Sequence, residues 1–218
     1  MFVVVHSAFC VSKDVENVVA ISTTHLRRHR VSIFYQSEYN TLDQSKEHIM
    51  NTQQYALALP YPELTGYLSP KEVRCLVDDY GGRKGETTAV MQYIYQHYIL
   101  DTEYPEIGDA LMGIAITEMH HHELLGEAIV MAGGDPIIAG STCFWSGSNV
   151  NYIKNPASIL RTNIEAERQA IAKYRRTIEC VSNPSLKDLI SRIIMDEELH
   201  ISTFQDLLGT LTQEPIQY

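Results

Sequence analysis

The sequence lacks the paired cysteines that mark small metal or redox sites. Its four cysteines are far apart, and none belongs to a C-x-x-C pair: Cys10, Cys75, Cys143 and Cys180. This spacing excludes a zinc knuckle, a rubredoxin-type iron site and a redox dithiol. Scattered cysteines of this kind are typical of reduced thiols in the cytoplasm, and we predict that state and a cytoplasmic location.

The sequence is also poor in basic charge and in long apolar runs. It has 17 lysines and arginines against 27 acidic residues, and this net charge of -10 disfavours nucleic acid or an anionic membrane as the partner. The longest apolar opening, residues 1–11, is interrupted by His6 and Ser7, so it fits neither a signal peptide nor a membrane span. The 44% of hydrophobic residues are nevertheless enough to fill the core of one globular domain.

Residues 1–49 differ from the rest of the chain. They carry a basic cluster between His25 and Arg30 and show no sustained helical period. We expect an N-terminal arm here that is either disordered or not translated. In the second case Met50 is the true start, because Lys46 and Glu47 can be encoded as a ribosome-binding sequence. In both cases we expect residues 50–218 to form the folded domain.

Capping and helix-breaking residues predict four helices over about 70–98, 105–133, 156–182 and 184–211. The first begins with the capping sequence Ser69–Glu72 and crosses three glycines at 81, 82 and 85, which indicate a bend or a close helix contact. The first and third connections between these helices are short, and the second is long. Two helical hairpins joined by one long crossover, between the second and third helices, have the connectivity of a ferritin-like four-helix bundle. The predicted fold class is therefore all-α.

An internal repeat places six metal-binding side chains at matching positions. Two helices carry an E-x-x-A-x-x-x-Y element and the other two carry an E-x-x-H pair, and 32 and 30 positions separate the element from the pair in the two halves. In each E-x-x-H pair both side chains leave the same helix face. The predicted ligands are Glu86, Glu118, His121, Glu167, Glu197 and His200.

Four carboxylates and two imidazoles suit two divalent metal ions about 3.5–4 Å apart, because anionic bridges offset the repulsion between the ions. We expect Glu118 and Glu197 to bridge the metals, while each remaining glutamate and histidine binds one metal. Tyr93 and Tyr174 lie on the ligand face, and two roles stay open for them: core packing, or hydrogen bonds to ligand carboxylates. Four neighbouring residues point away from the ligands and are expected outside the site: His120, His122, Glu165 and Glu198.

The ligand order E, E-x-x-H, E, E-x-x-H resembles the ferritin-like superfamily over residues 69–211. Within it, the sequence YGGRKGE of residues 80–86, followed by Tyr93 and Gln96, resembles the first helix of manganese catalases and related spore-coat proteins. The sequence EMHHHEL of residues 118–124 resembles their second helix. Thr117 departs from this pattern, because an acidic residue is expected at its position.

This resemblance implies a dinuclear manganese or iron oxidoreductase that converts hydrogen peroxide to water and oxygen. One alternative is a rubrerythrin-like di-iron peroxidase, which would require an external electron donor because the chain has no C-x-x-C pairs. Another is a bacterioferritin-like ferroxidase that uses dioxygen. A third is a non-catalytic, spore-coat-like bundle in which the metal pair only staples the helices. We expect a homo-oligomer in each case.

Overall fold

The computed structural model describes residues 55–213, so the predictions for residues 1–49 lie outside the described residues. The described part is all-helical, as predicted, and contains no β-strand. Its helices are α1 (Pro70–Tyr80), α2 (Glu86–Leu100), α3 (Pro105–Met131), α4 (Pro156–Cys180) and α5 (Pro184–Gln213), with one short 3-10 helix, η2 (Gly147–Asn149).

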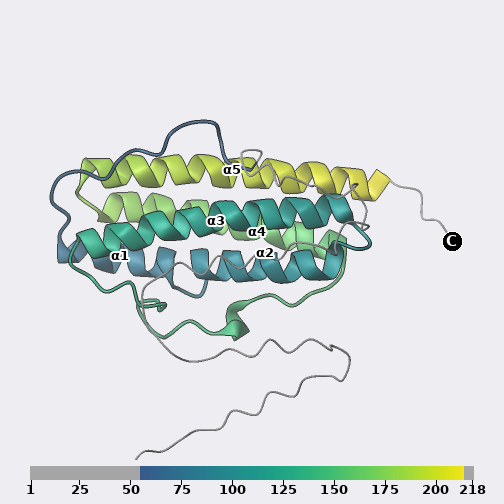
Figure 1. Cartoon of the computed structure of the whole chain (residues 1–218), viewed down its shortest axis with the longest axis horizontal. Coiled ribbons are helices and arrows are strands. Elements are labelled where there is room, and N and C mark those ends of the chain that lie inside the picture. Colours follow the sequence, from purple (N-terminus) through teal and green to yellow (C-terminus); the bar gives the residue numbers. More distant parts are fainter. Residues whose placement is uncertain (1–54, 214–218) are drawn as a thin grey trace, which may run out of the picture. The chain divides into compact units, whose positions relative to one another are not determined.

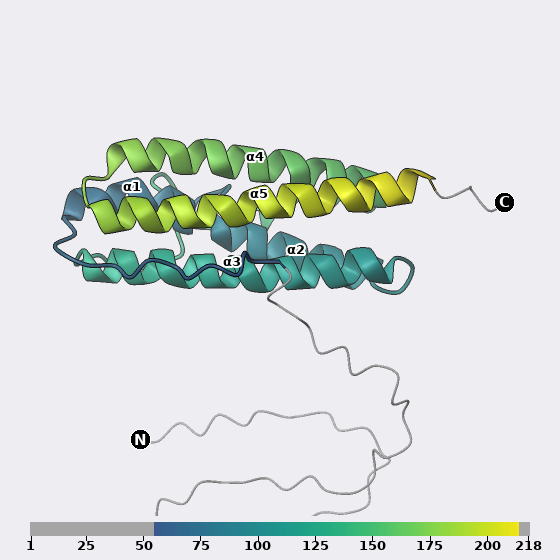
Figure 2. The same ribbon diagram turned by 90° about the horizontal axis from the view of Figure 1, so that it is seen from above.

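The helices form a bundle of two hairpins (Figures 1 and 2). Helices α1 and α2 follow one another along one row of the bundle and pack against α3, whereas α4 packs against α5. Residues 132–155 form the long crossover between the two hairpins and run along the outside of α1 and α2. This arrangement confirms the predicted bundle with one long crossover.

The first predicted helix is interrupted. Instead of bending, it ends at Tyr80 and begins again at Glu86. The glycines at the break allow close backbone packing: a Cβ atom on Gly81 would lie 2.6 Å from the backbone of Ala139 in the crossover. The break therefore makes room for the crossover, and it places Glu86 in the first turn of a new helix.

Glu72 fastens the start of α1 to the connection between α4 and α5. Its carboxylate accepts hydrogen bonds from the backbone N–H groups of Ser69 (2.5 Å), Ser182 (3.0 Å) and Asn183 (2.8 Å). Burial alone would raise the pKa of Glu72, but these three donors hold it below its ordinary value. The predicted capping residue thus also joins the two hairpins.

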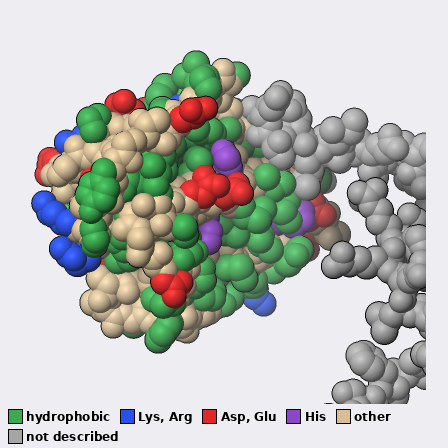
Figure 3. All heavy atoms as spheres, turned by 60° about the vertical axis from the view of Figure 1, so that its left-hand side comes forward, with side chains coloured by type: hydrophobic (Ala, Val, Ile, Leu, Met, Phe, Trp, Pro, Cys, Tyr) green, Lys and Arg blue, Asp and Glu red, His purple; other side chains and the backbone are tan. Residues whose placement is uncertain are grey.

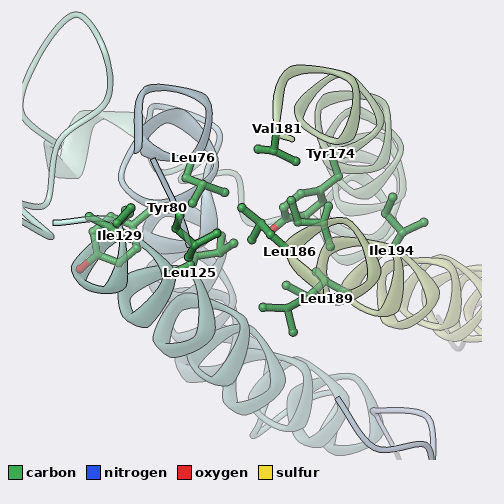
Figure 4. Close-up of a cluster of buried hydrophobic side chains, with 14 of the residues drawn as sticks. Leu76, Tyr80, Leu125, Ile129, Tyr174, Val181, Leu186, Leu189 and Ile194 are labelled. Atoms are coloured by element: carbon green, nitrogen blue, oxygen red, sulfur yellow. The ribbon is translucent and has the colours of Figure 1, made fainter. Parts of the chain in front are cut away.

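Two clusters of buried hydrophobic side chains fill the bundle, one toward each end. Figure 4 shows side chains of α1, α3, α4 and α5 pointing toward one another in the first cluster, among them Leu76, Leu125 and Leu189. Helix α5 contributes Ile190, Ile193, Ile194 and Phe204 to these clusters, and all four are buried. The candidate metal centre lies among buried polar residues between the two hydrophobic clusters.

The prediction of reduced cysteines is wrong for two of the four. Cys75 on α1 and Cys180 at the end of α4 form a disulfide, with Cα atoms 6.1 Å apart. Cys143 is free and exposed, and Cys10 lies outside the described residues. The sequence gives no signal for this pair, because 105 positions separate the two cysteines and only the packing of α1 on α4 brings them together.

The surface of the described part mixes apolar and charged side chains (Figure 3). Several large hydrophobic residues are exposed, including Tyr67 (80%), Tyr98 (71%) and Phe144 (74%). Within residues 55–213, each helix is too short or too polar to cross a membrane.

Candidate metal centre

The structure brings all six predicted ligands together in the middle of the bundle. Helix α2 contributes Glu86 and α4 contributes Glu167, while α3 and α5 contribute the two E-x-x-H pairs. All six side chains are at most 4% exposed. Their ligand atoms form two groups of four, and within each group these atoms lie within 4.8 Å of one another. Glu118 and Glu197 belong to both groups, which is the position that a bridging carboxylate requires.

Both histidines turn the same ring nitrogen toward these shared glutamates. The Nδ1 atom of His121 lies 3.0 Å from Glu118 and 3.4 Å from Glu197. The Nδ1 atom of His200 lies 3.0 Å from Glu197 and 3.2 Å from Glu118. Nδ1 is therefore the nitrogen available for a metal, and Nε2 faces away from the site.

The outward nitrogens have different partners. His121 Nε2 lies 3.2 Å from a carboxylate oxygen of Asp196, whereas His200 Nε2 lies 2.9 Å from the backbone carbonyl of Tyr55. A hydrogen bond from Nε2–H fixes the orientation of the ring and leaves Nδ1 free to bind a metal. A charged acceptor makes Nδ1 a more basic metal ligand than a neutral acceptor does. The two histidines thus have the same orientation and different basicity.

Asp196 is a residue of the candidate site that the sequence did not reveal. It is fully buried and is held by Arg192 (2.7 Å), by the backbone N–H of Leu57 (2.8 Å) and by the hydroxyl of Tyr61 (2.5 Å). Burial would raise the pKa of this carboxyl, but the bonds from His121, Arg192 and Tyr61 hold it well below its ordinary value. Asp196 is therefore ionised and can anchor His121. Its signal in the sequence was its position directly before Glu197, the place that Thr117 occupies in the other half.

Residues 55–61 form a segment that lies across the outer side of both histidines. It supplies the carbonyl of Tyr55 to His200 and the hydroxyl of Tyr61, which lies 3.4 Å from His121 Nε2. Gly113 on α3 allows the approach, because a Cβ atom there would overlap the ring of Tyr55. Burial, together with the bond to Asp196, raises the pKa of Tyr61 to about 12, so its hydroxyl keeps its proton.

The two tyrosines of the sequence repeat contact the glutamates of the opposite hairpin. Tyr93 on α2 donates a hydrogen bond to Glu167 on α4, and Tyr174 on α4 donates one to Glu86 on α2. Both tyrosines are also fully buried core residues. Each tyrosine therefore has both of the roles that the sequence left open, core packing and a hydrogen bond to a candidate ligand carboxylate. These exchanged bonds fix the carboxylates that belong to only one group of ligand atoms.

Three of the four neighbours predicted to lie outside the site do so, whereas the fourth, Glu165, is exposed and lines the pocket that reaches the ligands. His120 is exposed and lies 3.3 Å from Glu123, while His122 stacks on Tyr80 with ring centres 4.1 Å apart. Glu198 is exposed and lies 3.8 Å from Arg175.

The four buried glutamates of the site favour the binding of cations. Burial raises the pKa of Glu86 and of Glu167 well above the ordinary value, and the charges of neighbouring glutamates raise both further. Burial opposes charge on His121 and His200, but the carboxylates around them raise their pKa values well above the ordinary value. Among residues 55–213, no lysine or arginine pairs with any of the four glutamates. Such a site holds protons that a bound metal would displace.

The donor set fits a pair of divalent ions. Oxygen and imidazole nitrogen are ligands suited to manganese and iron, and buried glutamates without cations are costly. Glu118, which belongs to both groups of ligand atoms, has His200 Nδ1 3.2 Å from its Oε1. A divalent ion would replace this contact with a ligand bond.

A cavity of about 440 Å³ reaches the site from outside, in the groove between α2 and α4. All four glutamates line it, whereas neither histidine does. Small side chains keep it open, since Ala89, Ala166 and Ala170 stand on its walls. Ala89 and Ala170 are the alanines of the repeated E-x-x-A-x-x-x-Y element, so the repeat specifies the access route as well as the ligands.

Comparison with known proteins agrees with this architecture. The chain is 26% identical over 182 residues to Protein CotJC of Bacillus subtilis (73% of this chain, 95% of that protein). It is 31% identical over 127 residues to a bacterioferritin of Desulfovibrio desulfuricans (57% and 69%). The crystal structure of KatB, a manganese catalase from Anabaena, superposes with a TM-score of 0.65 at 26% identity (71% and 80%).

The family model of the ferritin-like domain matches residues 84–213, which include all six predicted ligands. This match covers more than half of the chain and spans α2 to α5. The chain belongs to the ferritin-like domain family.

Proposed function

We propose that the chain binds two divalent metal ions and uses them to consume hydrogen peroxide, as a manganese catalase does. The observation that carries this proposal is the pair of overlapping ligand groups that share Glu118 and Glu197. In this arrangement the two shared glutamates would bridge the ions, Glu86 and His121 would complete one site, and Glu167 and His200 would complete the other. The similarity to KatB supports the choice of peroxide and of manganese.

The bound metal pair would supply Lewis acidity and a reversible one-electron change at each ion. The protein's own residues do the rest. Tyr93 and Tyr174 hold the terminal carboxylates in place, and Asp196 orients His121. The groove between α2 and α4 admits a small molecule to the four carboxylates, while the surrounding apolar clusters keep bulk water from the histidine side.

The charge around the groove favours peroxide over ferrous ion as the substrate. Four basic residues line it, Arg83, Lys84, Arg161 and Lys173, against a single acidic residue besides the ligands, Glu165. A basic entrance repels cations and does not hinder a neutral molecule. This feature weighs against a ferroxidase that takes up iron by this route, although the similarity to a bacterioferritin keeps that function as the second candidate.

The first test is a count of metal atoms. The protein is purified without chelators from cells supplied with iron and manganese, and its metals are measured by elemental mass spectrometry. Two manganese ions per chain, with oxygen release from peroxide and no added reductant, would support the proposal. Two iron ions with turnover only in the presence of an electron donor or dioxygen would favour the peroxidase or the ferroxidase. Two ions without turnover would leave a metal-stapled structural bundle.

We also propose a homo-oligomer, because aromatic side chains such as Tyr98 and Phe144 are exposed. Light scattering of the purified protein gives its molar mass directly.

A further inference from the structure

The groove between α2 and α4 is larger than hydrogen peroxide requires. Its volume is about 440 Å³, whereas two oxygen atoms fill on the order of 60 Å³, twice the share of one water molecule. Its size is in the range of sites that hold organic ligands, roughly 300–1,000 Å³. The groove can therefore accept a molecule of several carbon atoms in addition to, or in place of, peroxide.

The charged residues of the rim are not equally available to a ligand. The ammonium group of Lys173 bonds to two backbone carbonyls and lies 3.4 Å from Asp79, so its charge is compensated. Glu165 is engaged by Arg168 (3.9 Å) and by the amide of Gln169 (2.9 Å). What remains is a positive rim on an otherwise acidic protein.

Arg161, like Arg83, is a groove-lining arginine for which residues 55–213 offer no ion pair, and of the two it is the one that lies on α4. It is exposed, it lines the groove, and it forms no ion pair with any residue of the part of the chain that the structure describes. The residues that line the groove with it include the neutral Thr162, Asn149 and Asn151. The nearest acid along α4, Glu165, pairs away from it. A guanidinium among neutral polar groups is a good partner for a carboxylate, which it can bind through two parallel hydrogen bonds.

Arg161 and the candidate ligand Glu167 lie on the same helix, α4, within reach of one small organic molecule. Glu167 lies six residues after Arg161, which is about 9 Å along the helix axis, and Ala166, between them in the sequence, also lines the groove. A carboxylate bound at Arg161 would therefore direct a short alkyl chain over Ala166 toward the ligand glutamates.

From this arrangement we infer that the groove binds a short-chain organic carboxylate, with its carboxylate on Arg161 and its alkyl chain over the metal centre. The inference rests on the proposed function, because two divalent ions balance the four glutamates that would otherwise repel an anion. The ligand is a co-substrate or an inhibitor of the metal centre, since it occupies the route by which peroxide would enter.

The single tryptophan of the chain provides a direct measurement of binding. The indole N–H of Trp145 donates a hydrogen bond of 2.9 Å to the hydroxyl of Thr88, and Thr88 lines the groove. Metal-loaded protein is titrated with hexanoate and, separately, with 1-hexanol, while tryptophan fluorescence is recorded. We expect a saturable change with hexanoate and binding of hexanol that is at least about tenfold weaker, because hexanol lacks the charged bond to Arg161.

Three variants define the site. Arg161→Gln should weaken hexanoate binding by at least about tenfold and leave hexanol unchanged. Ala166→Leu should fill the groove and abolish binding of both molecules. Arg175→Gln is the matched control, because Arg175 is an exposed arginine of the same helix that does not line the groove, and it should bind hexanoate normally.

The outcomes separate this inference from the proposed function. Two bound metals together with equal binding of hexanoate and hexanol, or equal effects of Arg161→Gln and Arg175→Gln, would overturn the inference and leave the metal centre intact. A folded protein without stoichiometric metal would overturn both. Metal content is measured for every variant, so a loss of hexanoate binding counts only when both ions are retained.

Discussion

The two halves of the candidate metal centre repeat each other at the ligands and differ behind the histidines. His121 is backed by the ionised carboxylate of Asp196, whereas His200 is backed by the neutral carbonyl of Tyr55. The residue that matches Asp196 in the other half is Thr117, whose hydroxyl bonds weakly to Gly113 at 3.4 Å. The repeat in the candidate ligands therefore gives two proposed metal positions whose histidines differ in basicity, and we expect the two ions to differ in affinity.

Removal of a glutamate that both halves share should have the largest effect on metal content. Glu118→Ala or Glu197→Ala should lose nearly all bound metal, because each glutamate belongs to both ligand groups. The remaining buried charges should also lower the free energy of unfolding by about 3–5 kcal/mol. By contrast, Glu86→Ala or Glu167→Ala should retain about half of the metal. Elemental analysis distinguishes the two classes, and equal metal loss in all four variants would contradict the bridging role.

A second change cuts a link between the hairpins outside the metal site. Cys75→Ser removes the disulfide between α1 and α4 and should lower the free energy of unfolding by about 2–4 kcal/mol, because the bond closes a long loop. Metal content should not change. Cys143→Ser is the control, since that thiol is free and exposed. Equal stability of both variants in denaturant titrations would show that the bond does not form in solution.

The third prediction isolates the difference between the histidines. Asp196→Asn should weaken metal binding at the His121 position by about 10-fold to 100-fold, because the imidazole loses its charged acceptor. Thr117→Val, the matching change in the other half, should alter affinity by less than about threefold. Metal titrations followed by calorimetry compare the two. Equal weakening in both variants would mean that the halves are equivalent.

Protons should compete with metal in both halves. Glu86, Glu167 and both histidines have raised pKa values in the metal-free fold. The metal-free folded protein therefore binds more protons than the unfolded chain, so its free energy of unfolding falls as pH rises from about 5 to about 8. Metal affinity should rise over the same interval, by up to about tenfold per pH unit for each proton displaced. Melting of metal-free protein at increasing pH checks the sign, and Glu86→Gln should reduce the slope.

The smallest effects should come from the exchanged tyrosine bonds, where the halves are alike. Tyr93→Phe and Tyr174→Phe each remove one hydrogen bond to a terminal glutamate, and each should cost about 1 kcal/mol of stability. Thermal melts of the metal-loaded variants should give nearly equal shifts. A large difference between the two melting shifts would show that the two halves differ at the terminal glutamates as well as behind the histidines.

The sequence was sufficient to predict that the six candidate ligands lie together, because the i, i+3 spacing of each E-x-x-H pair and the matched tyrosines repeat with the period of the hairpins. It also predicted the bundle and its crossover. The glycines before Glu86 indicated a bend or a close helix contact, but they did not reveal that the helix ends there and that the crossover packs against the break.

Contacts between distant segments could not be predicted from local patterns. No spacing rule connects Cys75 to Cys180, or Tyr55 to His200, because each pair meets only after the helices have packed. Asp196 had a weak signal, its place before Glu197, but its role depends on the facing histidine of another helix. The repeated alanines were visible as a pattern, and only the groove explains them.

The segment of residues 55–61 extends the proposed metal-binding unit beyond the helices of the bundle. The first helix of the bundle begins at Pro70, so an N-terminal truncation at that residue would leave every helix and every proposed ligand in place. It would nevertheless strip the acceptor from His200 and the Tyr61 hydroxyl from Asp196. A fragment that retains the whole bundle can therefore lose the function of the centre, and the smallest active fragment should begin before Tyr55.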